Sequence, residues 1–285
     1  MTAVLSDPGP ARLMGARRRR RVMVSTLTPV ATLSLGVAVT WFSLLVLIPL
    51  AALVVTATGG GWSQYVDTLT NAQTLAAIRL TVGQSLLVTI VNAVVGTVIA
   101  WVLVRDRFWG KRVLDVVIDI PFALPTIVAG LVLLSLYGPR SPIGLDWANT
   151  RNAVTLALAF VTLPFVVRTV QPVLEELDHD VEEAAASLGA QRLTIVRRLI
   201  LPSLAPAIAA GAGLAFARAI AEYGSLVLLS GNLPYRTEVV SVRVLSFVEG
   251  GNPAAAASLA TVMLGVALVV IVGLDLLQRK VARRG

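Results

Sequence analysis

Residues 180–202 read DVEEAAASLGAQRLTIVRRLILP, and this polar stretch separates two long apolar regions of the chain. Its first part is rich in helix formers and ends at Gly189, the residue type that most often terminates a helix in a left-handed conformation. Asp180 and Glu183 have the spacing of a capping box. Residues 190–201 alternate apolar side chains with arginines, which predicts an amphipathic helix. Two such short helices cannot bury a core, so we expect them to rest on a membrane surface or insert into a partner protein.

The apolar regions on either side belong to a set of six stretches that contain no charged residue. They cover residues 33–57, 80–104, 120–139, 152–167, 199–217 and 250–274. About 20 helical residues cross the hydrocarbon core of a bilayer, which is roughly 30 Å thick. Most of these stretches are therefore long enough to span it. The fourth is short, and we expect it to span because Arg151 and Arg168 can extend their side chains to the two interfaces.

The composition also indicates an integral membrane protein. The chain has 285 residues, of which 56% are apolar and 14% charged, and its mean hydropathy is +0.81. Soluble domains carry about 25% charged residues. The chain has no cysteine, and His179 is its one histidine. Disulfide frameworks, thiolate metal sites and histidine-based triads are therefore excluded, and we expect no metal site.

The basic residues predict the orientation of the chain in the membrane. Eighteen of the 24 lysines and arginines fall at the two termini and in the loops after the second and fourth stretches. Because positively charged loops stay in the cytoplasm, both termini are predicted to be cytoplasmic. Residues 1–32 and 278–285 are then basic tails, and residues 33–277 form the transmembrane domain. This placement explains the net charge of +8 without a nucleic-acid partner. The first stretch is longer than the apolar core of a cleaved signal peptide, so we expect it to be retained.

The loop between the fourth and fifth stretches carries a family resemblance. It resembles the EAA signature of ABC importer permeases, with Leu199 in place of the usual isoleucine. The resemblance implies an all-α, polytopic type I ABC importer permease (MetI-like) fold with six transmembrane helices. It also implies that residues 168–199 form a cytoplasmic coupling loop that docks on a separate ATPase. The residues implied in coupling are Glu183, Ala184, Ala185, Gly189, Leu199, Leu201 and Pro202.

The chain lacks the G-x-x-x-x-G-K-[ST] loop that cradles nucleotide phosphates. We therefore expect no cofactor in this chain and no enzymatic activity of its own. The resemblance implies that two partner ATP-binding subunits hold MgATP instead.

Two further blocks resemble one subfamily of these permeases. Residues 119–130, DIPFALPTIVAG, are similar to the T-type permease of sulfate/thiosulfate importers, and so are AEYGS at 221–225, SGNLP at 230–234 and RTE at 236–238. This resemblance implies a homologous W-type permease as partner, a periplasmic or lipid-anchored sulfate-binding protein, and a place in the bacterial inner membrane. Molybdate permeases are the nearest alternative.

Four residues are candidates for the translocation pathway. Arg218 and Glu222 lie four apart near the end of the fifth stretch, on one helical face, where an arginine in the bilayer normally faces a cavity or a partner. The pair either offers donors to an anion or neutralises itself and fixes helix packing, and the sequence leaves both open. Pro125 interrupts the third stretch, and a helix break near a polar path exposes carbonyl groups. Ser230 lies in the second subfamily block.

Two other function classes stay open from the residues alone. An ion-coupled secondary anion transporter is expected to carry several ionisable residues within its spans and to have repeated halves. A membrane-embedded enzyme needs clustered acids, bases or metal ligands. Neither pattern is clear in the sequence, which favours the ABC permease.

Overall fold

The computed structural model describes residues 29–282, without the side chains of residues 29, 179, 277, 278 and 280–282, and all its regular elements are helices. Five helical segments are long and apolar enough to cross a membrane, and a bent helix pair makes a sixth crossing if it counts as one span. The predicted all-α, polytopic fold is thereby confirmed. Contacts divide the chain into two units that meet between Pro49 and Leu50.

The N-terminal unit is helical and apolar. Helix α1 (Pro29–Phe42) continues through a short π-helix, η1 (Ser43–Leu47), into the first residues of α2 (Ile48–Thr58). The π-turn lies just before Pro49, and the amide of Ile48 donates to the carbonyl of Ser43. Proline lacks an amide hydrogen and crowds the preceding turn, which the wider π-turn relieves. Of the predicted tail, residues 1–28 lie outside the described residues, and residues 29–32 already belong to α1.

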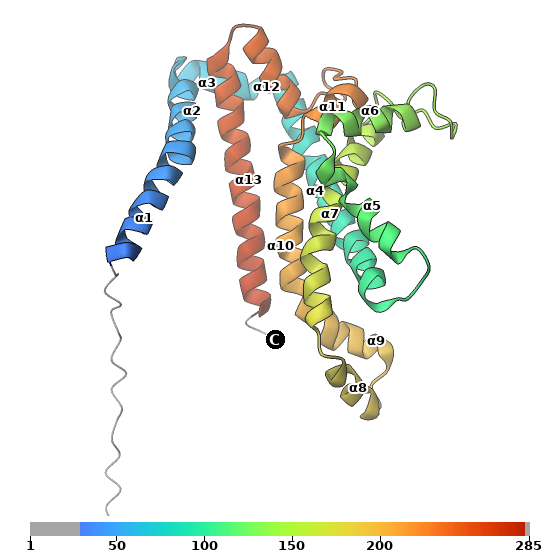
Figure 1. Cartoon of the computed structure of the whole chain (residues 1–285). Helices are drawn as coiled ribbons and strands as arrows, with labels where there is room; N and C mark the ends of the chain where they lie inside the picture. The colour runs from blue at the N-terminus through green and yellow to red at the C-terminus, as the bar shows by residue number, and fades with distance from the viewer. Residues whose placement is uncertain (1–28, 283–285) are drawn as a thin grey trace, which may run out of the picture. The chain divides into compact units, whose positions relative to one another are not determined.

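The second unit has a core of four long helices that lie side by side in Figure 1. They are α4 (Ala72–Arg105), α7 (Arg151–Glu176), α10 (Leu201–Ile220) and α13 (Pro253–Ala282). Glycines allow three of them to approach closely. A Cβ at Gly96 of α4 would lie 2.9 Å from the Val166 side chain of α7, and one at Gly211 of α10 would lie 3.0 Å from the Val166 Cα. Such small-residue contacts are typical of helix packing in lipid.

The third apolar stretch is not one straight helix. Helices α5 (Lys111–Ala123) and α6 (Thr126–Tyr137) meet at an angle of 118°. Leu124 is extended at the break, as expected of a residue that precedes proline, here Pro125. The predicted span over 120–139 is therefore a bent pair of helices that begins at Lys111, and its break lies at Pro125, the residue predicted to interrupt the stretch.

The fourth span is longer than its uncharged stretch. Helix α7 continues through Arg168 to Glu176, because Val170 and Leu174 are buried in the core. The segment between this span and the next span, which begins at Arg192, is therefore residues 177–191, shorter than the predicted loop over 168–199.

The second unit has two distinct ends (Figure 1). Helices α8 (His179–Ser187) and α9 (Arg192–Ile195) lie at one end, with the last turns of α4 and α13. Helices α3 (Gly61–Thr70), α11 (Gly224–Leu229) and α12 (Val240–Glu249) lie at the other. The helix ends near α8 carry Arg105, Lys111 and Arg279, so one end is rich in basic residues. Which side of the membrane it faces stays a prediction.

Candidate functional site

Helix α8 is a short, well-capped helix between two spans. At its start, the Asp178 carboxylate accepts a hydrogen bond from the Asp180 amide at 2.9 Å, so the cap is Asp178 and the predicted capping box at Asp180 is wrong. At its end, Gly189 has a φ of +85°. The amides of Gly189 and Ala190 donate to the carbonyls of Ala186 and Ala185 at 2.9 and 3.1 Å. This is a Schellman motif, and it confirms the predicted left-handed glycine.

One face of α8 is apolar and exposed. Val181, Ala184 and Leu188 recur at the spacing of a single helical face, and the side chain of Leu188 is 90% exposed. Glu183 is exposed beside them, and Ala185 is half-buried. An exposed apolar helical face with a carboxylate beside it is the form that docks into a groove of a partner protein.

The other side of α8 is tied to the membrane helices. Glu182 forms an ion pair with Arg105 at the end of α4, with an N to O distance of 2.5 Å and both side chains largely buried. The Arg105 guanidinium also lies over the ring of Trp101, 5.8 Å from its centroid. A force on α8 therefore acts directly on α4, because a largely buried charge pair is costly to separate.

The chain that follows α8 enters the membrane through a second π-helix. Helix α9 leads through η2 (Val196–Ile200) into α10 without a break. Of the predicted coupling residues here, Leu199 is half-buried, and Leu201 and Pro202 are exposed; the buried residue is Ile200, between them. The π-turn before Pro202 has the same form as the one before Pro49.

A second charge cluster joins α5 to α7. The sequence predicts that Arg168 extends to the membrane interface, but its guanidinium instead donates to both oxygens of Asp119, at 2.7 and 2.6 Å, and to Asp115 at 2.7 Å. It also donates to the Asp115 carbonyl at 2.8 Å. The bidentate contact fixes the direction of α5 relative to α7. Sequence analysis missed this cluster; the four-residue spacing of the two aspartates on one helix was its one local signal.

Replacing Asp119 with asparagine should weaken this cluster without unfolding the chain. Asparagine keeps one acceptor but loses the charge and the second charge-assisted bond, which is worth about 1–2 kcal/mol for a half-exposed group. We expect the apparent melting temperature of the purified protein in detergent to fall by a few degrees. Asp146→Asn, on an exposed aspartate without an ion pair among the described residues, is the control. Equal melting temperatures for Asp119→Asn and the parent would contradict the assignment.

Arg218 and Glu222 form the predicted pair at the other end of the unit. Their N to O distance is 2.8 Å, and the side chain of Glu222 is 0% exposed. The second Glu222 oxygen accepts hydrogen bonds from the amide and hydroxyl of Ser225, at 2.8 and 2.9 Å. The Ser241 hydroxyl donates to the Glu222 backbone carbonyl at 2.7 Å. The carboxylate therefore joins the end of α10 to the start of α11.

The two remaining pathway candidates lie on the elements that pack around this carboxylate. Pro125 is exposed and caps α6, whose first turn touches the start of α11: a Cβ at Gly224 would lie 2.1 Å from the hydroxyl oxygen of Thr126. Ser230 is fully buried at the far end of α11 and donates to Asn232 at 2.9 Å. The structure thus places Pro125 beside the segment that carries Glu222, and gives Ser230 a separate local hydrogen bond.

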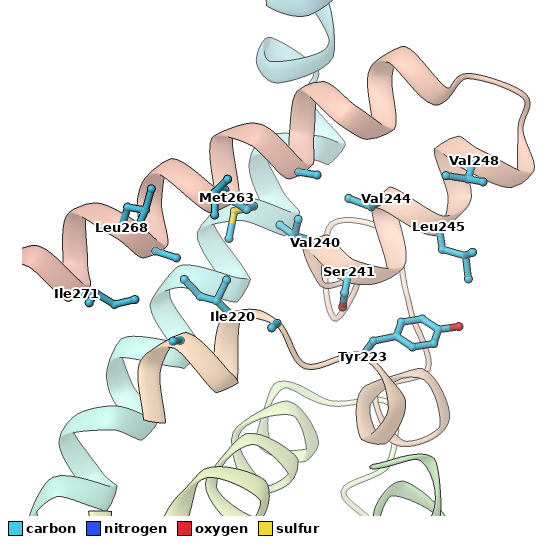
Figure 2. Close-up of a pocket in the computed structure, with 15 residues that line it drawn as sticks. Ile220, Tyr223, Val240, Ser241, Val244, Leu245, Val248, Met263, Leu268 and Ile271 are labelled. Atoms are coloured by element: carbon cyan, nitrogen blue, oxygen red, sulfur yellow. The ribbon is translucent and has the colours of Figure 1, made fainter. Parts of the chain in front are cut away.

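An open apolar groove of about 710 Å³ is lined by Ala217 and Ala221, the neighbours of the buried pair in the sequence, and Figure 2 shows its walls. Helices α10, α12 and α13 form it, with Ile220, Val244 and Met263 on its walls. Its polar side chains are Ser241 and Tyr223. A groove without a charged donor does not suit an anion, because burial of an unpaired charge is costly.

Residues 92–284 match the family described as "Binding-protein-dependent transport system inner membrane component". The chain belongs to this family. It is a membrane component of an importer, and α8 lies within the matched residues and carries Glu183, Ala184 and Ala185.

Several curated proteins resemble this permease over most of its length. The "Sulfate transport system permease protein CysT" of Salmonella typhimurium is 41% identical over 90% of this chain and 95% of its own. The protein of the same name from Escherichia coli is 39% identical over 95% of this chain and 99% of its own. The resemblance to T-type permeases is therefore confirmed.

Solved structures of ABC importers share the fold of this permease. A bacterial transporter involved in the import of the acidic polysaccharide alginate aligns with a TM-score of 0.74 at 16% identity, over 88% of this chain and 95% of that chain. The inward-facing methionine transporter MetNI aligns with a TM-score of 0.57 at 18% identity, over 74% of this chain and 99% of that chain. The predicted type I importer permease (MetI-like) fold is confirmed.

Proposed function

We propose that this permease forms half of the translocation pathway of an ATP-driven sulfate importer. The observation that carries the proposal is the 39–41% identity to sulfate transport system permeases over at least 90% of this chain. Thiosulfate is the second substrate, since both are tetrahedral divalent sulfur oxyanions. A homologous W-type permease supplies the other half of the pathway, and a sulfate-binding protein delivers the anion from outside.

Competition between anions tests the substrate. Proteoliposomes that contain the complete importer should take up labelled sulfate, and unlabelled thiosulfate should inhibit this uptake at concentrations similar to those of unlabelled sulfate. Molybdate should compete at least tenfold more weakly. Stronger inhibition by molybdate than by thiosulfate would assign the chain to the molybdate class instead.

The second part of the proposal is that α8 couples this chain to an ATPase. Its exposed face of Val181, Ala184 and Leu188 provides the contact surface, and Glu183 accepts hydrogen bonds from the partner. Two ATPase subunits bind MgATP and close, and because α8 is tied to α4 through Arg105, this closure favours the outward-open form of the membrane helices. Hydrolysis then restores the inward-open form.

The proposed orientation gives a topology prediction. The basic end of the unit, with α8, faces the cytoplasm, as the distribution of lysine and arginine indicates. A reporter that is active only in the cytoplasm should therefore be active after Gly285 and in the loop from Asp106 to Lys111. It should be silent near Gly60 and near Asn252. Activity at Gly60 would show that the orientation is inverted and that α8 cannot meet a cytoplasmic ATPase.

A further inference from the structure

A smaller cavity of about 370 Å³ is lined by residues near the start of α4, the helix whose last turn lies near α8 (Figure 1). Early turns of α4, the first residue of α7 and the loop before α12 form its walls. Its polar lining residues are Arg79, Gln84, Arg151 and Tyr235. The rest of the lining is Ala76, Leu80 and Gly83, so no carboxylate of the residues that the structure describes lines it. At about 30 Å³ per water, the cavity holds on the order of ten waters.

The two arginines of this cavity have no carboxylate partner. Neither Arg79 nor Arg151 forms an ion pair within residues 29–282. The Nε of Arg151 donates to the Arg236 carbonyl at 3.3 Å, which leaves its two terminal nitrogens to face a ligand. In contrast, Arg168 and Arg218 have their own aspartate or glutamate. Two guanidinium groups on one cavity repel each other, and a bound anion removes that repulsion.

The other groups around the cavity are also suited to an anion. The Gln84 carbonyl oxygen accepts from the Thr155 hydroxyl at 2.6 Å, so its amide hydrogens remain to donate. The Tyr235 hydroxyl adds a donor. Arg151 is the first residue of α7, a helix of 26 residues, whose positive dipole end lies there. The cavity thus combines two cations, two neutral donors and a helix N-terminus.

We propose that this cavity binds a tetrahedral divalent oxyanion, and that it receives the substrate at the outer end of the permease. The claim that the cavity receives the substrate rests on the proposed sulfate import and on the proposed orientation. The claim that the cavity binds an oxyanion rests on the residues of the cavity alone. A phosphate group of a lipid headgroup has the same chemistry, so the test distinguishes a free oxyanion from a lipid.

A single cysteine placed in the cavity reports its electrostatic potential. The chain has no cysteine, and a Cβ at Gly83 meets no atom within 4 Å, so Gly83→Cys introduces one thiol without a clash. Thiosulfonate reagents that carry either a sulfonate or a trimethylammonium group then label it in the purified importer in lipid-free detergent. The ratio of anionic to cationic labelling should be about tenfold higher than for Ile143→Cys, an exposed site on the loop after α6.

Two further arms test the ligand. Sodium sulfate should slow labelling at Gly83→Cys more than sodium chloride of equal ionic strength does, and Arg79→Gln with Arg151→Gln should remove both this protection and the anionic preference. Arg140→Gln, an exposed arginine on the same loop as Ile143, should leave both unchanged. Ala76→Cys is the second reporter if Gly83→Cys is poorly produced.

The outcomes distinguish a failure of this proposal from a failure of the proposed sulfate import. An equal ratio of anionic to cationic labelling at Gly83→Cys and Ile143→Cys, or equal protection by sulfate and chloride, would overturn the cavity as an oxyanion site. Labelling that is slowed by anionic lipid in nanodiscs but not by free sulfate in detergent would also overturn it, since the occupant would then be a headgroup. Because labelling requires no transport, a failure of sulfate uptake by the parent importer would instead contradict the proposed function.

Discussion

Replacing Gly189 with valine should abolish ATP-dependent uptake while the chain stays in the membrane at near-normal abundance. Gly189 has a φ of +85°, where a β-branched residue costs about 1–3 kcal/mol. A Cβ there meets no atom within 4 Å, so the effect comes from the backbone and not from a clash. The chain relieves the strain by re-aiming the short α8, whose angle a rigid ATPase groove cannot follow. We expect copurification of the ATPase to fall at least tenfold.

Gly189→Asn is the matched control, because asparagine tolerates the left-handed conformation. This variant should retain most of the ATP-dependent uptake and most of the copurifying ATPase. Glu183→Lys should resemble the valine variant, because it reverses the charge on the docking side of α8. Loss of the membrane protein itself in Gly189→Val would make the glycine structural. Full uptake with normal ATPase retention would contradict a coupling role for α8.

Removing the buried carboxylate of Glu222 should have the largest effect on stability. Glu222→Ala leaves Arg218 without its partner and the Ser225 amide without its acceptor, at a side chain that is 0% exposed. Breaking a buried pair from one side costs about 3–5 kcal/mol. We therefore expect membrane abundance and the melting temperature in detergent to fall sharply. Arg218→Gln should also destabilise, because it strands the buried charge of Glu222.

The double variant Arg218→Gln with Glu222→Gln separates packing from transport. It removes both charges together, so its stability should recover most of the loss seen in either single variant. If the pair serves the pathway, the stable double variant should transport sulfate at least tenfold more slowly than the parent. Normal transport by the double variant would show that the pair serves helix packing and not the translocation pathway. A double variant no more stable than Glu222→Ala would show that the two groups are not coupled.

The features that the sequence predicted are local ones. The apolar stretches could be predicted because each membrane helix places apolar side chains in lipid along one continuous segment. The left-handed conformation of Gly189 could be predicted from its position at a helix end. The pair of Arg218 and Glu222 follows from a spacing of four residues. In each case the partners lie within one or two turns, so the pattern is visible without tertiary structure.

The features that the sequence did not predict depend on distant partners. Arg168 meets Asp115 and Asp119 across 53 and 49 residues, and Arg105 meets Glu182 across 77. The break at Pro125 was predicted, but its angle of 118° was not, because the direction of α6 depends on its contacts with α7 and α11. The cap at Asp178 was missed because a second aspartate follows two residues later.

Uptake by the reconstituted importer tests the central claim most directly. Proteoliposomes that contain this chain, its partner permease, the two ATPase subunits and the sulfate-binding protein should accumulate labelled sulfate when MgATP is supplied on the ATPase side. Omitting the ATPase or replacing MgATP by MgADP should reduce accumulation to the level of empty liposomes, and an imposed ion gradient should not restore it. Accumulation driven by an ion gradient with this chain alone would contradict the account.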